Sequence, residues 1–411
     1  MLFIAGLGLS SFVNVRLTSF ITLGDGLLIA ALVLMGYRFL ASPQSIAINL
    51  IRPAFYYFCV LSLVVGGTLS SLLASDRTGS FGGLVRILFV TVALPLLASS
   101  TLTREIGLVW AMYVVAVAGA IQGVGAALQL QGIDVPFLGP LAYGRLSGFS
   151  DHVNHLGSAG ALAAPIALAA ALLTARKPLI SLLLALCSLL CLAAVLLSGS
   201  VGAALGTIVG AGVMGYYWLK FRPGGLPTAG AMVSGIFVIA CLLIAFSTVG
   251  PMLRERLDTG VTPMDRLTEV RGGAGTGSIR LATIRAALDR IYKNPLVGVG
   301  FAEKDSVAHS GQQVHNAPLM IWHTGGVLAM FGYLGVILIA VKTVRRDSGQ
   351  KRLRIVQAGI LGSLAAAFTV SLTQPVLFQR FPWVPVLLAF SSVFARSHQS
   401  AGYPKPRQTA G

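Results

Sequence analysis

The chain has 411 residues, of which 55% are hydrophobic and only 10% are charged, and its mean hydropathy is +0.82. A soluble domain carries about 25% charged residues, so this composition excludes an ordinary soluble domain and indicates a polytopic membrane protein. The net charge of +17 does not indicate nucleic-acid binding, because no basic patch on a soluble domain accompanies it.

Apolar segments of about 20 residues are expected to cross a membrane as helices. Eleven such segments follow one another, at about 22–40, 54–74, 81–99, 106–129, 153–174, 178–197, 199–219, 230–249, 315–341, 354–374 and 378–395. Residues 1–20 are ambiguous, because Asn14 and Arg16 interrupt their apolar run. A short span, a re-entrant segment and the remnant of a longer N-terminus all fit. We predict an all-α membrane protein with about twelve transmembrane helices.

The basic residues of the short loops predict the orientation of the chain. Sixteen Lys and Arg residues fall in one set of loops and the tail, and three, Arg77, Arg145 and Arg380, fall in the alternate loops. The first set is therefore expected in the cytoplasm. The loop at 130–152 and the hydrophilic segment at 250–313 are expected on the other side, which is the periplasm in a Gram-negative cell.

The hydrophilic segment divides the chain into predicted regions. A helix near 278–293 is expected within it, because Ser278 can cap the helix and Pro295 ends it. The predicted regions are an N-terminal transmembrane bundle of about nine helices at 1–249, a large periplasmic loop at 250–313, C-terminal transmembrane helices at 314–396, and a disordered cytoplasmic tail at 397–411.

Arginine, histidine and asparagine residues of the two outer loops could form one site. Arginine binds phosphate oxygens in bidentate fashion and stays charged at physiological pH. A neutral histidine can accept a proton from a hydroxyl group. Together they could activate a sugar hydroxyl and stabilise a departing diphosphate. The candidate residues in these loops are Arg145, Asn154, Arg280, Arg285, His315 and Asn316.

Three short blocks stand in a defined order along the chain. They are Arg145-x-x-Gly148 followed by Asn154; Arg280, fifteen residues before Pro295-Leu296-Val297-Gly298-Val299-Gly300; and His315-Asn316 followed by Gly325-Gly326. With the number of spans and the large loop before the last three, this series resembles the O-antigen ligase and O-antigen polymerase superfamily of bacterial membrane glycosyltransferases. The resemblance covers most of the chain in architecture and about sixty residues in motif.

The resemblance implies a GT-C-like helical fold in the bacterial inner membrane, with the active site facing the periplasm. It implies transfer of an undecaprenyl-diphosphate-linked glycan to lipid A–core or to a growing glycan, with inversion and without a metal or cofactor. By resemblance, Arg145 and Arg280 hold the diphosphate. His315 is the base or orients the acceptor hydroxyl, and Arg285 and Asn316 support these groups.

Several alternatives stay open at this point. A ligase and a polymerase of O-antigen or exopolysaccharide share the donor chemistry. The other classes are a lipid-linked oligosaccharide flippase and a non-catalytic scaffold.

The roles of several single residues are also open. Arg86 lies inside a predicted span, where it either extends toward the membrane surface or contacts lipid phosphates, with Asp25 as a plausible partner. His152, His155 and His309 are interpreted as structural or solvated, and the role of His323 is open.

Overall fold

The computed structural model describes residues 2–12, 22–41, 54–102, 105–133, 135–141, 145–220, 276–302, 304, 307–309, 311–345 and 350–401. The span expected at 230–249 and the first part of the hydrophilic segment therefore lie outside the described residues. So does the end of the tail. The described part of the chain is mainly helical and includes one two-stranded antiparallel sheet.

The described part of the chain before residue 221 is a series of helices. In chain order they are α1 (Leu2–Phe12), α2 (Leu23–Ala41), α3 (Ala54–Leu73), α4 (Arg77–Leu88), a π-helical turn (Phe89–Ala93), α5 (Leu94–Thr101), α6 (Glu105–Leu130), α7 (Val153–Leu173), α8 (Pro178–Leu197) and α9 (Val201–Lys220). Then follow α12 (Thr276–Lys293), β1 (Val307–His309), β2 (Gln312–Gln313), α13 (Ala317–Val344), α14 (Lys351–Ser371), a 3-10 turn (Phe381–Trp383) and α15 (Val384–Ala401).

Eight helical segments within the described residues are long and apolar enough to cross a membrane, counting α4 to α5 as one. One shorter apolar stretch, Leu23–Tyr37, lies in α2, and another, Phe381–Ser392, covers the 3-10 turn and the first part of α15. This confirms a polytopic helical membrane protein. The helix expected near 278–293 is α12, and α15 continues to Ala401, beyond the boundary expected at 396.

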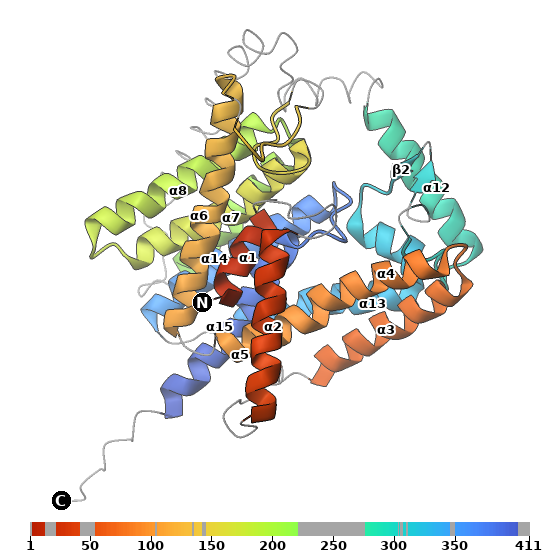
Figure 1. Ribbon diagram of the computed structural model, residues 1–411, viewed down its shortest axis with the longest axis horizontal. Coiled ribbons are helices and arrows are strands. Elements are labelled where there is room, and N and C mark those ends of the chain that lie inside the picture. The colour runs from red at the N-terminus through yellow and green to blue at the C-terminus, as the bar shows by residue number, and fades with distance from the viewer. Residues whose placement is uncertain are drawn as a thin grey trace, which may run out of the picture.

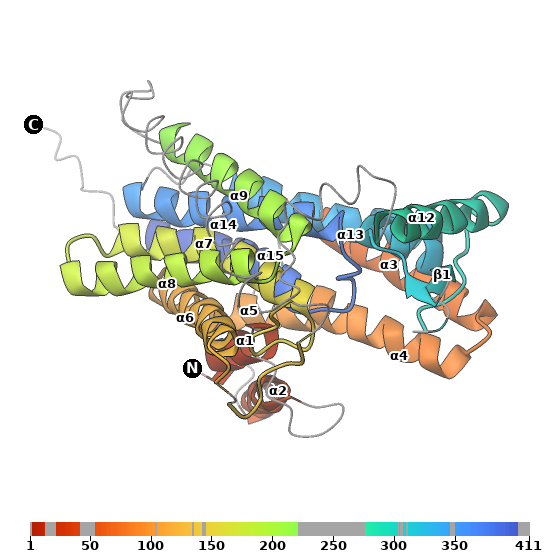
Figure 2. The same ribbon diagram turned by 90° about the horizontal axis from the view of Figure 1, so that it is seen from above.

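The centre of the bundle is α7, which packs against α6, α8, α9 and α14 (Figures 1 and 2). Of its apolar span, 83% is buried inside the protein, the largest share among the eight spans. Small residues permit this packing because they let helix backbones approach closely. At the contact between α9 and α14, a Cβ on Gly210 would lie 2.7 Å from the carbonyl oxygen of Gly362.

Helix α13 is broken at Gly326, whose φ of 75° and ψ of 178° are not helical. The segment 295–300 lies against this break and replaces the lost helical hydrogen bonds. The amides of Val299 and Gly300 donate to the carbonyls of His323 and Thr324, and the amide of Val327 donates to the carbonyl of Pro295. The glycines of the second motif block therefore serve this close backbone contact.

An ion pair joins the N-terminal end of α2 to the loop after α14. It links Asp25, which also accepts hydrogen bonds from Thr22, to Arg380. The sequence-based suggestion that Asp25 pairs with Arg86 is therefore wrong. Arg86 is exposed on α4, whereas the buried Asp25 carboxylate lies beside the guanidinium that can neutralise it.

Candidate active site

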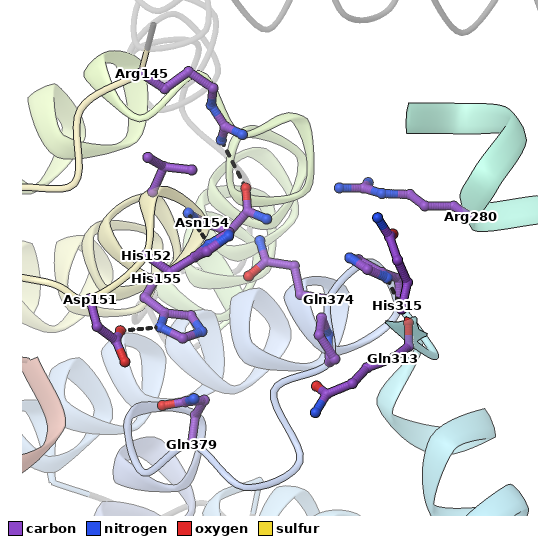
Figure 3. Close-up of a pocket in the computed structure, with 13 residues that line it drawn as sticks. Arg145, Asp151, His152, Asn154, His155, Arg280, Gln313, His315, Gln374 and Gln379 are labelled. Atoms are coloured by element: carbon purple, nitrogen blue, oxygen red, sulfur yellow. Dashed lines mark hydrogen bonds and ion pairs between the residues drawn. The ribbon is translucent and has the colours of Figure 1, made fainter. Parts of the chain in front are cut away.

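One cavity of about 550 Å³ contains most of the candidate residues (Figure 3). It lies between the N-terminal end of α7, helix α12, the β1–β2 hairpin and the loop that follows α14. These segments are far apart in the sequence, so the cavity exists only in the folded chain. Its charged and imidazole lining residues are Arg145, Asp151, His152, His155, Arg280 and His315.

Arg145 forms one buried wall of the cavity, with only 3% of its surface exposed. Its Nε donates to the carbonyl of Ser198, 2.7 Å away, and its Nη2 donates to Oδ1 of Asn154, 2.8 Å away. Two acceptors at a guanidinium fix its orientation. Asn154 also lines the cavity, so the first motif block joins an arginine to the asparagine that orients it.

Two glutamines on α6 hold the loop that presents Arg145. Oε1 of Gln129 accepts from the amides of Ser147, at 3.0 Å, and Gly148, at 2.7 Å. Oε1 of Gln122 accepts from the amide of Phe149 at 3.1 Å. Gly148 has a φ of +58°, a conformation that favours glycine. The glycine of the first block therefore shapes the turn that follows Arg145.

Arg280 comes from the first half of α12 and extends into the cavity from the side opposite Asp151 (Figure 3). Arg285, five residues later, is exposed and is not among the described residues that line the cavity. Five residues turn an α-helix by about 500°, so two side chains at this spacing lie on different faces. The structure thus brings Arg280, but not Arg285, to the site.

His315 is oriented by the strand that precedes it. Its Nδ1 lies 2.8 Å from the carbonyl oxygen of Gln313. Since a carbonyl only accepts, Nδ1 carries the hydrogen, and in the neutral ring Nε2 has the lone pair. Burial and the nearby positive charge of Arg280 both lower the pKa of His315 from its ordinary value, and burial is the larger cause. The neutral, proton-accepting ring is therefore favoured.

Two further histidines, interpreted from the sequence as structural or solvated, also line the cavity. His152 caps α7, with its Nδ1 accepting from the amide of Asn154 at 3.0 Å. Burial, with His155 and Arg145 as further causes, lowers the pKa of His152 to about 4. Nδ1 of His155 lies 2.7 Å from Oδ1 of Asp151. A histidine beside a carboxylate is a second possible proton acceptor.

Gln374 is a buried site residue that the sequence did not reveal. It follows α14 in the sequence, and its side chain lies between Ser158 of α7 and Ser200, just before α9. It also lines the cavity. Its Oε1 accepts from the hydroxyl of Ser158 at 2.8 Å, and its Nε2 donates to the hydroxyl of Ser200 at 3.2 Å. A glutamine in a turn after an apolar helix has no sequence signal of its own. Only its buried partners identify it.

Three more residues discussed in the sequence analysis, Asn316, Arg86 and His323, do not line this cavity. Asn316 caps α13, because its Oδ1 accepts from the amide of Leu319 at 2.9 Å, while its Nδ2 donates to the carbonyl of Leu372. Arg86 and His323 are also not among the described residues that line the first cavity. His323 is buried on α13 and borders a different cavity. The side chain of His309 lies outside the described residues.

The fold and the cavity together define a polytopic helical membrane protein with a cationic, histidine-containing site. Residues 183–334 match the family model described as O-antigen ligase. The matched segment contains Arg280, His315 and the 295–300 segment, whereas Arg145 precedes it. The match confirms the resemblance of the chain to the O-antigen ligase superfamily and supports a ligase- or polymerase-like membrane enzyme. No curated protein matches the chain.

Proposed function

We propose that this protein transfers a glycan from an undecaprenyl-diphosphate carrier to a sugar hydroxyl, as an O-antigen ligase-like enzyme. The observation that carries the proposal is the meeting of Arg145, Arg280 and His315 in one cavity. Two guanidiniums suit a diphosphate, and a histidine with a lone pair suits a hydroxyl. The family match to residues 183–334 supports the same class of reaction.

The acceptor hydroxyl is activated by His315 in this proposal. Nδ1 of His315 stays bound to the Gln313 carbonyl, and Nε2 takes the proton of the hydroxyl. The hydroxyl oxygen then forms a bond to the anomeric carbon of the donor glycan. Attack on the face opposite the leaving group inverts that carbon. The lowered pKa of His315 keeps the ring neutral and ready to accept the proton near pH 7.

The leaving group is the carrier diphosphate. As the bond between the anomeric carbon and the diphosphate oxygen breaks, the electron pair goes to that oxygen. Arg280 and Arg145 stabilise this negative charge. Their electrostatic interaction with it is strongest in a site shielded from water, where the dielectric constant is low. Arg145 is pre-oriented by Ser198 and Asn154, so little reorganisation is needed during the reaction.

We further propose that the site faces the periplasm and that the protein lies in the bacterial inner membrane. The distribution of basic residues among the loops supports this orientation. The donor carrier and the acceptor, either lipid A–core or a growing glycan, then reach the cavity from the outer leaflet. The arginines act on the diphosphate directly, so the proposed steps need no cofactor.

The test is deletion of the gene, with lipopolysaccharide and secreted polysaccharide separated side by side on gels. We expect carrier-linked polymer to accumulate while the core stays bare, which indicates a ligase. Single-repeat caps on the core would instead indicate an O-antigen polymerase, and loss of secreted polymer alone an exopolysaccharide polymerase. Glycans that stay unchanged in every fraction would contradict the proposed transfer.

A further inference from the structure

A second cavity of about 650 Å³ lies at the other end of α12. Arg290, which lines it, is ten residues from Arg280, or about 15 Å along the helix axis. The polar residues that line this cavity are Ser75, Arg290, Lys293, Asn294, Lys304 and His323. Three of them are cations, and no carboxylate is among its described lining residues. This is the composition of an anion site.

The cations of this cavity come from two separate segments. Arg290 and Lys293 lie in the last turn of α12, where the partial negative charge of the helix end favours them without any ligand. This explanation does not cover Lys304, which follows the 295–300 segment and approaches from outside the helix. Lys304 lies 3.6 Å from Asp76, which neutralises part of its charge. Among the described residues that line the cavity, together with Asp76, positive charge still exceeds negative charge.

The three cations are exposed, and one of them is held by a hydrogen bond to the backbone. Nη1 of Arg290 donates to the carbonyl of Val307, 3.1 Å away, which holds its guanidinium beside strand β1. His323, 2% exposed, borders the cavity from α13. Ser75 contributes from the turn between α3 and α4. Figure 1 shows α12 and the hairpin beside the ends of α3 and α4.

The β1–β2 hairpin separates the two cavities. Val307 lines the second cavity and pairs with Gln313, which lines the first. Gln313 also orients His315 through its carbonyl. A ligand in the second cavity therefore lies next to the strand that positions the imidazole, while remaining separate from Arg280 and Arg145.

We propose that the second cavity binds a phosphate group. A phosphate monoester carries close to two negative charges near pH 7 and several acceptor oxygens, which three cations can match. A single carboxylate would leave two of the three cations without a counter-charge. The phosphate group is either part of a free anion or the headgroup of a lipid, since the cavity lies at the ends of membrane-spanning helices. This binding does not depend on the proposed glycan transfer.

The test uses full-length Arg280→Gln protein, in which phosphate binding by the first cavity is weakened. Binding of inorganic phosphate to the protein in neutral detergent is measured by equilibrium dialysis. In parallel, the protein is placed in phosphatidylcholine nanodiscs with a minor fraction of phosphatidic acid, and retained phosphatidic acid is measured by mass spectrometry. The test variant adds Lys293→Gln and Lys304→Gln. The control instead adds Arg77→Gln, at an exposed arginine that begins α4 and lines neither cavity.

We expect saturable binding that the paired lysine substitutions weaken by about tenfold or more and that Arg77→Gln leaves unchanged. Binding of inorganic phosphate supports a free phosphate ligand, and binding of phosphatidic acid alone supports a lipid headgroup. Lack of saturable binding in both arms, or equal binding by the paired variant, would overturn the proposal. Loss of glycan transfer in Arg280→Gln with phosphate binding intact separates this site from the proposed enzymatic one.

Discussion

Arg145 is buried, and its guanidinium donates hydrogen bonds to two acceptors. These contacts predict how substitution by lysine affects stability. A lysine ammonium cannot reach the Ser198 carbonyl and Asn154 Oδ1 with the same planar fork. We expect Arg145→Lys to lower the free energy of unfolding by about 2 kcal/mol, within the range for hydrogen bonds to charged groups. Thermal unfolding in detergent measures this, and Arg285→Lys is the exposed control. Equal unfolding temperatures for wild type and Arg145→Lys would contradict the structural role.

Burial of the ring, and to a smaller extent the positive charge of Arg280, lowers the pKa of His315 from its ordinary value of 6.5. A lowered histidine pKa means that the ring loses its proton at a lower pH than usual. We expect the C2 proton of His315 in NMR spectra to titrate below pH 6.5, and to titrate at higher pH in Arg280→Gln. The signal is assigned by its loss in His315→Asn. Identical titration curves in both proteins would contradict the proposed closeness of the two side chains.

At the scale of elements, the broken helix α13 is the feature most sensitive to substitution. A Cβ at Gly326 would overlap the Leu296 carbonyl, and its backbone conformation is almost restricted to glycine. We expect Gly326→Ala to destabilise the protein by about 2 kcal/mol or more. Folded yield and unfolding temperature measure the effect. Gly212→Ala and Gly215→Ala, where no atom lies within 4 Å of the added Cβ, should be tolerated. A stable Gly326→Ala protein would contradict the described break.

The sequence predicted most of the long apolar helices that the structure describes, but not the break in α13. An apolar run of about 20 residues is sufficient to expect a membrane helix, and α3, α6, α7 and α8 follow their predicted ranges closely. The apolar run at 315–341 did not indicate a break, because glycines are also frequent in packed membrane helices that are unbroken. The break depends on hydrogen bonds from the segment 295–300, and such long-range contacts are not visible in an apolar pattern.

The sequence likewise predicted only part of the candidate site, because some of its residues depend on long-range contacts. Arg145, Arg280 and His315 were found because their chemistry and order resemble a family motif, and they line one cavity. Gln374 and the pair of Asp151 and His155 were missed, because each has its role only through neighbours that the fold brings close. Asn316 was expected to support the arginines and His315, whereas its side chain caps α13.

At the scale of the whole molecule, the site depends on segments spread over more than half of the chain. Arg145 precedes α7, Arg280 lies on α12, and Gln374 follows α14. The central bundle around α7 holds the segments of Arg145 and Gln374, because α7 contacts α8, α9 and α14, whereas α12, which carries Arg280, packs against α13 and β1. A variant that loses activity is therefore informative only when the amount of folded protein in the membrane is unchanged.

The most direct test of the central claim is complementation of the deletion strain with Arg280→Ala and His315→Ala. Arg285→Ala is the matched control, since it removes a neighbouring arginine of α12 that does not line the cavity. Surface glycan is compared on gels, and membrane levels of each variant are measured by immunoblot. We predict that both site variants lack the glycan at normal membrane levels while Arg285→Ala restores it. Wild-type glycan in both Arg280→Ala and His315→Ala would contradict the proposed site.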